Sequence, residues 1–291
     1  MARHATPLET VAVTVPEDAV EAFEAALLTA CDTVGLFLDE DTRLWHLEGV
    51  RPVGVKEADL ASALALANAV SGLEVTPERT PTESEGWLAR TYDSFQEQLI
   101  GRRFAVRGSH LNGPPALSRI TLTLNAGVAF GSGEHGSTRG CLLALERIAY
   151  RRPRRILDLG TGSGILAMAV AALLKRPVLA TDIDPWSVRV TRENAAANGL
   201  GHLVRPQLAD GWHGADRRGP YDLVLANILA RPLCAMAKDL AANLAPNGTA
   251  ILAGLLSRQV RWVLSAHRRH GLVLEQLVPQ GAWTTVVLRK R

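Results

Sequence analysis

Cysteine is scarce in this chain. The three that occur, Cys31, Cys141 and Cys234, are widely spaced and form no metal-ligand pattern. An odd number of scattered cysteines favours buried thiols over a disulfide framework or a structural zinc site. We therefore expect no disulfide bond and no bound metal ion.

Long apolar runs are also missing. Residues 1–10 contain no apolar segment of the kind that a secretory signal needs, and the longest apolar stretch, about 165–174, is too short to cross a bilayer. The sequence contains no internal repeat and no low-complexity tract. These absences predict a soluble, cytoplasmic protein with no membrane partner.

Basic residues are few in the first 85 positions, where five lysines and arginines stand against sixteen acidic residues, a balance of −11. The rest of the chain has 27 basic and 13 acidic residues, a balance of +14, so the net charge of +3 hides two parts of opposite sign. Aromatic residues are also few, at 5%. The basic runs at 151–155 and 267–270 therefore lack a stacking platform, and an RNA-binding protein is the less favoured alternative.

Apolar residues are plentiful enough for two cores, since they make up 47% of the 291 positions. Residues 9–79 follow the order strand, helix, strand, strand, helix, strand, which is typical of a ferredoxin-like α+β domain. We place this small N-terminal domain at 1–80. A linker and a short helix follow at 81–98, and a second domain occupies 99–291.

The second domain is organised around residues 154–184, which predict a strand, a glycine loop, a helix and a second strand. Gly160, Gly162 and Gly164 let the backbone turn tightly and approach a ligand at the start of the helix. A dinucleotide-binding loop has a small residue where this chain has Ile165. That difference weakens the alternative of a dehydrogenase.

Two carboxylates indicate which ligand binds. Asp158 precedes the glycine loop, where it would repel a pyrophosphate but accept hydrogen bonds from an ammonium group. Asp182 lies 24 residues later, at the end of the second strand, where a carboxylate binds the hydroxyls of a ribose. A ligand with a ribose and a cationic amino acid end, but no phosphate, is S-adenosylmethionine. The plainer alternative is that the glycines and Asp182 only shape a turn.

Strands and helices alternate to the end of the chain, where two strands at 271–279 and 283–290 must pair antiparallel. This arrangement predicts an α/β fold with the seven-stranded, doubly wound sheet of a class I methyltransferase. Ligands bind such sheets at the carboxyl ends of the strands. The polar residues expected at that edge are Asp158, Asp182, Asp210 and Asn227.

Asn227 ends the fourth strand in the segment ANILARP, where amino-group methyltransferases commonly carry an Asn-Pro-Pro-aromatic signature. Its amide oxygen is suited to accept a hydrogen bond from an attacking amine, which makes Asn227 the candidate catalytic residue. The alternative is a turn asparagine that starts the next helix. The missing aromatic favours an aliphatic amine as the methyl acceptor.

A glycine-rich stretch at 125–140 leads into a helix whose first turn carries Ser137 and Thr138. In one interpretation these hydroxyls cap the helix. In the other, a hydroxyl points at a cofactor that lies beneath the loop. The residues alone favour neither.

Several segments, in this order and spacing, resemble the ribosomal protein L11 methyltransferase (PrmA) family, namely GVAFGSGEHGSTRGCLLALE, ILDLGTGSGILAMA, TDIDPWSV, ENAAANG, DLVLANILARPL and LAGLLSRQ. The resemblance covers most of residues 120–291 and implies S-adenosylmethionine-dependent methylation of amino groups on a large-subunit ribosomal protein. It puts cofactor contacts on Thr138, Gly160, Asp182 and Asn227. Ser132 stands where the family usually has threonine, and residues 136–137 where it has proline-threonine.

The resemblance also implies that the N-terminal domain recognises the ribosomal protein. Such a substrate is basic, so we expect the acidic domain to capture it free, before assembly, and not to bind nucleic acid. Solubility of a small domain is the plainer explanation of the acidity. Methylation of another protein or of a small-molecule amine is the alternative function.

Overall fold

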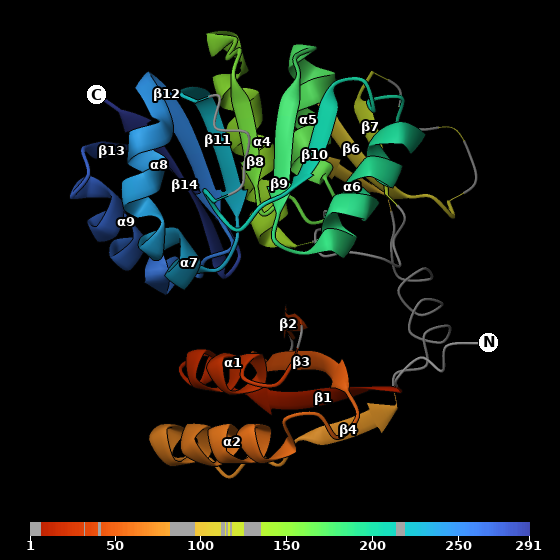
Figure 1. Cartoon of the computed structure of the whole chain (residues 1–291), viewed down its shortest axis with the longest axis vertical. Helices are drawn as coiled ribbons and strands as arrows, with labels where there is room; N and C mark the ends of the chain where they lie inside the picture. Colours follow the sequence, from red (N-terminus) through yellow and green to blue (C-terminus); the bar gives the residue numbers. More distant parts are fainter. Residues whose placement is uncertain are drawn as a thin grey trace. The chain divides into compact units, whose positions relative to one another are not determined.

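The chain forms two compact units in the computed structural model, Met1–Ala89 and Arg90–Arg291 (Figure 1). The structure describes residues 7–31, 33–39, 42–81, 97–111, 114, 116, 118–124, 135–213 and 219–291. The linker and short helix predicted at 81–98 lie almost wholly outside these residues, and the domain boundaries stay a prediction. Among the described residues, no helix combines the length and apolar character needed to span a membrane.

The first unit contains a four-stranded antiparallel sheet in the order β2-β3-β1-β4, with two helices that lie side by side (Figure 1). Its elements are β1 (Leu8–Val15), α1 (Val20–Leu28), β2 (Thr33–Leu38), β3 (Trp45–Pro52), α2 (Glu57–Ser71) and β4 (Glu78–Pro81). The predicted ferredoxin-like order of elements is confirmed. Its core includes the fully buried side chains of Phe23, Leu27 and Leu47.

The last strand of this unit starts later than the sequence predicts, at Glu78 instead of residue 73. The Asn68 side chain binds the backbone of Val75 twice, because its Oδ1 accepts from the Val75 N–H at 2.9 Å and its Nδ2 donates to the Val75 oxygen at 3.1 Å. These bonds satisfy the backbone groups that a strand would have offered to the sheet.

The second unit contains a seven-stranded sheet in the order β10-β9-β8-β11-β12-β14-β13 (Figure 1). Its strands are β8 (Ile156–Leu159), β9 (Val178–Asp182), β10 (Val204–Leu208), β11 (Tyr221–Asn227), β12 (Leu244–Ala253), β13 (Leu272–Gln280) and β14 (Trp283–Lys290). Strands β8 to β12 are parallel, and β14 runs antiparallel to both β12 and β13. The predicted fold class, including the terminal hairpin, is confirmed.

Helices cover both faces of this sheet, and each face has its own hydrophobic core. One core is built on α4 (Gly136–Ile148), α5 (Ile165–Leu174) and α6 (Pro185–Ala197), and the other on α7 (Ala230–Ala235), α8 (Ala237–Asn243) and α9 (Val260–Arg268). Eight of the ten residues of α5 are buried, as expected for a helix that is apolar all round. The single helix predicted at 230–245 is two helices, and it ends early because Leu244 already pairs with Tyr221 in the sheet.

A third, three-stranded sheet joins the α4 and α5 side of the second unit. Its strands are β5 (Gln98–Ile100), β6 (Phe104–Gly108) and β7 (Ile120–Leu124). Glu146 of α4 anchors the turn between β5 and β6, because its carboxylate accepts the backbone N–H groups of Arg102 at 3.2 Å and Arg103 at 2.6 Å. Ile100 and Phe104 are fully buried in the same core as α5.

Candidate active site

The predicted glycine loop follows β8 and leads into α5. Gly160, Gly162 and Gly164 have φ angles of 71°, 53° and 82°, in the left-handed region that favours glycine. A Cβ atom at Gly164 would lie 2.8 Å from Cγ2 of Thr191, and one at Gly160 would overlap the side chain of Ile228. The loop therefore needs glycine both for its backbone conformation and for its close packing.

Asp182 ties this loop to the end of β9. Its Oδ2 accepts a hydrogen bond from the Gly162 N–H at 2.9 Å, and its Oδ1 accepts one from the Asp184 N–H at 3.0 Å. The backbone oxygen of Thr181 accepts two further bonds, from the N–H groups of Gly160 at 2.8 Å and Thr161 at 2.9 Å. The glycine loop and Asp182, which lies 20 residues after Gly162, are thus in direct contact.

Asp158 lies beneath the loop and is 1% exposed. Its Oδ2 accepts hydrogen bonds from the Thr161 hydroxyl at 2.7 Å and the Ala167 N–H at 3.0 Å. Its Oδ1 is buried and has no hydrogen-bond partner among the described residues. Burial raises the pKa of Asp158 to about 7; the bonds from Thr161 and Ala167 act against this rise, and the charge of Asp182 adds to it.

Asn227 and Thr138 meet at the end of β11. The Asn227 Nδ2 donates a hydrogen bond to the hydroxyl of Thr138 at 3.2 Å, and Thr138 is fully buried in the first turn of α4. The Asn227 Oδ1 is buried and unpaired within the described part of the chain. His135 is the N-cap of α4, so the alternative that the Thr138 hydroxyl caps this helix is wrong. Asn227 is the last residue of β11, two positions before Leu229, the N-cap of α7, so it does not itself start that helix.

The sequence reasoning missed Gly254, which follows β12 and has a φ of 80°. A Cβ atom there would lie 2.5 Å from the backbone oxygen of Ile228. Because Asn227 pairs with Ala253 in the sheet, a glycine directly after that apolar strand was the signal available in the sequence. Gly160 and Gly254 therefore both pack closely against Ile228, the residue after Asn227.

His135 begins the helix that carries Thr138. Its ring centroid lies 4.1 Å from that of Trp283, and its Nδ1 is 2.6 Å from the hydroxyl of Ser137. Burial lowers the pKa of His135 to about 4, so its imidazole is neutral at physiological pH. The predicted covering loop, including Ser132, falls mostly at 125–134, outside the described residues.

These side chains form a group of hydrogen-bond acceptors at the carboxyl ends of neighbouring strands. Asp158 lies near the end of β8, Asp182 ends β9, Asn227 ends β11, and Asp210 lies just beyond the end of β10, all as the sequence predicts. Asp210 also bridges to His213. Burial raises the pKa of the Cys141 thiol, which leaves it unsuited to be a nucleophile. The described residues contain no group of side chains suited to hold a metal ion. The arrangement fits a cationic, hydroxyl-bearing ligand.

Comparisons with known proteins all indicate the same family. The model of the family "Ribosomal protein L11 methyltransferase (PrmA)" matches residues 12–291. The ribosomal protein L11 methyltransferase of Bradyrhizobium diazoefficiens is 46% identical over 212 residues, 72% of this chain and 71% of its own length. The enzyme of the same name from Rhizobium rhizogenes is 40% identical over 255 residues, 86% of each chain.

A solved structure agrees with these relatives. The ribosomal protein L11 methylase of Lactobacillus delbrueckii subsp. bulgaricus is 30% identical and superposes with a TM-score of 0.61, covering 68% of this chain and all of that one. The family match spans nearly the whole sequence and both units. This chain therefore belongs to the ribosomal protein L11 methyltransferase family.

Proposed function

We propose that this chain transfers the methyl group of S-adenosylmethionine to amino groups of ribosomal protein L11, on lysine side chains, the N-terminal amine or both. The observation that supports this most is the buried Oδ1 of Asn227, which has no hydrogen-bond partner among the residues that the structure describes. The names of the relatives supply the substrate. Because ribosomal proteins are made in the cytoplasm, we expect the reaction there.

Different residues of the site would bind the two ends of the cofactor. The hydroxyl pair of the ribose would bind Asp182, and the ammonium group of the methionine part would bind the unpaired oxygen of Asp158. The glycine loop would let the backbone approach the ligand closely. When bound, S-adenosylmethionine supplies an activated methyl group on a sulfonium, so the protein needs no covalent nucleophile.

Asn227 would act on the substrate amine. Its Nδ2 is fixed by Thr138, which leaves the Oδ1 to accept a hydrogen bond from the amine and to aim the nitrogen lone pair. An amine with a pKa near 10 is mostly protonated at neutral pH and must lose a proton before it attacks. Another protein or a small-molecule amine is the second candidate substrate, since the site itself would align any aliphatic amine.

The acidic N-terminal unit would recruit the substrate. Glu17, Asp18 and Glu21 lie at the start of α1 and are exposed. Basic ribosomal protein would be drawn to such a surface, whereas ribosomal RNA would be repelled. This charge pattern favours a free ribosomal protein over one already bound to RNA.

Replacing Asp182 with alanine should weaken the binding of S-adenosylhomocysteine about tenfold or more, because charge-assisted hydrogen bonds to the ribose are lost. Isothermal titration calorimetry measures this. A 2′,3′-dideoxyribose analogue is the control, since it cannot make these bonds and should lose little affinity. Equal losses for both ligands would mean that the substitution only loosens the loop.

The affinity for S-adenosylhomocysteine should rise about eightfold between pH 6 and pH 7.5. Only the carboxylate form of Asp158 accepts an ammonium group, and with a pKa of about 7 its ionised fraction grows over this range. Methylthioadenosine, which lacks the amino acid end, should bind independently of pH. The same should hold for S-adenosylhomocysteine with the Asp158→Asn variant, and a pH dependence that survives in this variant would contradict the assignment.

Replacing Asn227 with alanine should lower turnover about a hundredfold while changing cofactor affinity far less, because alignment matters most in the transition state. Thr138→Val, which removes the hydroxyl that holds Asn227, should also reduce turnover, whereas Thr138→Ser should stay active. Steady-state kinetics and calorimetry on the same samples separate the two effects. Small and equal losses in both quantities would remove Asn227 from the mechanism.

The rate of association with ribosomal protein L11 should fall at least about tenfold between low and high salt, since steering by surface charge is screened over about 8 Å at physiological ionic strength. Stopped-flow measurements with the Glu17→Lys/Glu21→Lys variant should show slower association and a weaker dependence of the association rate on salt. The control is Glu193→Lys/Asp239→Lys, two exposed acids of the second unit. A salt-insensitive rate, or the same effect in the control, would show that the acidic unit does not recruit the substrate.

A further inference from the structure

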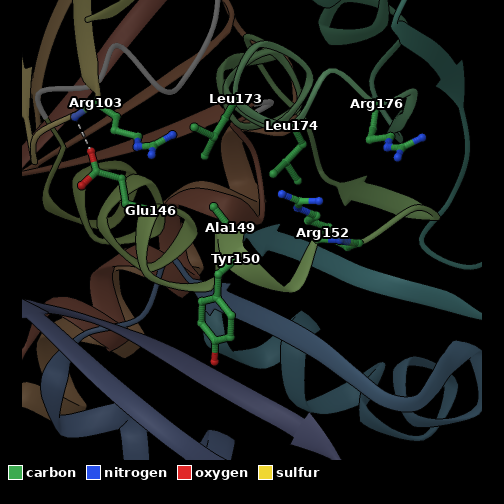
Figure 2. Close-up of a pocket in the computed structure, with 9 residues that line it drawn as sticks. Arg103, Glu146, Ala149, Tyr150, Arg152, Leu173, Leu174 and Arg176 are labelled. Atoms are coloured by element: carbon green, nitrogen blue, oxygen red, sulfur yellow. Dashed lines mark hydrogen bonds between the residues drawn. The ribbon is translucent and has the colours of Figure 1, made fainter.

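A pocket of about 550 Å³ opens on the second unit, at the edge of the sheet opposite the candidate active site (Figure 2). Its lining comes from the β5–β6 turn, from the end of α4 and the segment that joins it to β8, and from the end of α5 and the segment just before β9. Parallel strands begin at this edge, whereas the glycine loop, Asp182 and Asn227 lie where they end. The methyl-transfer chemistry described above uses no residue of this pocket.

Arginines and apolar side chains share the wall. Figure 2 shows Arg103 and Glu146 on one side, Arg176 on the other, and Leu173, Leu174 and Arg152 between them. The guanidinium groups of Arg103, Arg152 and Arg176 are exposed, and none has a hydrogen bond or ion pair among the described residues. Three positive charges therefore line one pocket against the single negative charge of Glu146 in its described lining.

The nearby carboxylates are already engaged. Glu146, the acidic residue in the lining, accepts the backbone N–H groups of Arg102 and Arg103. Asp222 accepts those of Arg154 and Arg155, both at 2.9 Å, and Glu275 pairs with Arg151. The acids near the pocket thus bind other groups, and its arginines are available to an anion.

Helix ends explain only part of this cluster. The carboxyl end of a helix favours nearby cations, and Arg152 and Arg176 follow the ends of α4 and α5. Arg103 lies in the turn between β5 and β6, where no helix ends. Its presence in the same pocket requires another reason.

We propose that this pocket is a second ligand site, which binds a nucleoside polyphosphate. Arginine binds phosphate oxygens through its planar, forked donors, and three arginines match the several charges of a polyphosphate. Leu173 and Leu174, both partly exposed, offer apolar surface to the sugar and base. Tyr150 also belongs to the lining, but Figure 2 shows its ring directed away from the arginines, and its hydroxyl accepts hydrogen bonds from Arg151 at 3.3 Å.

A bound RNA strand fits the pocket less well. Proteins that bind single strands provide several aromatic side chains on which successive bases stack. Tyr150 is the one aromatic residue in the lining of this pocket, within the described parts of the chain. A pocket of about 550 Å³ without a row of stacking side chains suits a single nucleotide better than a strand.

The test is calorimetric titration of the full chain with GTP, with S-adenosylhomocysteine present in saturating amounts so that the methyl-transfer site is filled. GTP should bind saturably, and Arg103→Ala/Arg152→Ala/Arg176→Ala should weaken it about a hundredfold. Arg192→Ala/Arg261→Ala/Arg268→Ala, which removes three exposed arginines elsewhere, should bind GTP as the unaltered chain does. Leu174→Ala should weaken the binding of GTP more than that of inorganic triphosphate, because only the nucleoside contacts the apolar part of the lining.

Other results would overturn the proposal. Absence of saturable GTP binding at millimolar concentration would exclude the site, and equal losses in the two triple variants would reduce it to general surface charge. If inorganic triphosphate binds as tightly as GTP, the nucleoside contributes nothing to binding, and the proposed ligand is wrong. A short oligouridylate that binds while GTP does not would make this edge an RNA surface.

Discussion

The candidate site depends on the close packing of Ile228 against two glycines, through its side chain at Gly160 and through its backbone at Gly254. Gly160 follows the strand on one side of β11 and Gly254 follows the strand on the other, and neither position has space for a Cβ atom beside Ile228. The ends of three neighbouring strands are therefore fixed against one another. Asn227 precedes Ile228 and takes its position from the same contact. A side chain at either glycine would displace the candidate catalytic residue without touching it.

A second constraint is electrostatic. Asp158 and Asn227 each have a buried oxygen without a partner in the described structure, and an unsatisfied buried polar atom costs about 1–3 kcal/mol. This cost lowers the stability of the free protein, and a ligand that donates a hydrogen bond to each oxygen relieves it. The same burial that raises the pKa of Asp158 strengthens its attraction for an ammonium group once the carboxylate is ionised.

Much of the second unit could be predicted from the sequence because local patterns decide it. Each of its main signals lies within a short stretch of sequence: the glycine spacing, the apolar helix α5 and the acids at strand ends. The alternation of strands and helices then limits the possible topologies. The hydrogen bond between Thr138 and Asn227 could not be predicted from local patterns, because it joins residues 89 positions apart. The residues alone left helix capping and cofactor contact equally open for Thr138. Only the resemblance to the family favoured a cofactor contact.

Three other features depended on contacts that sequence patterns do not encode. The delayed start of β4 follows from one asparagine side chain, and the early start of β12 from the pairing of Leu244. The arginine pocket combines residues of the β5–β6 turn with others about 50 and 70 positions later. Read along the chain, its arginines resemble ordinary solvated residues at helix ends; only the fold shows that they share one pocket.

Mass spectrometry of ribosomal proteins from cells that lack this chain tests the central claim most directly. If the chain methylates ribosomal protein L11, that protein should lose its methyl groups in these cells and regain them when the purified chain and S-adenosylmethionine are added. The Asn227→Ala variant should not restore them. Unchanged methylation of L11, with methyl groups missing from another protein or a small amine instead, would contradict the assignment of the substrate.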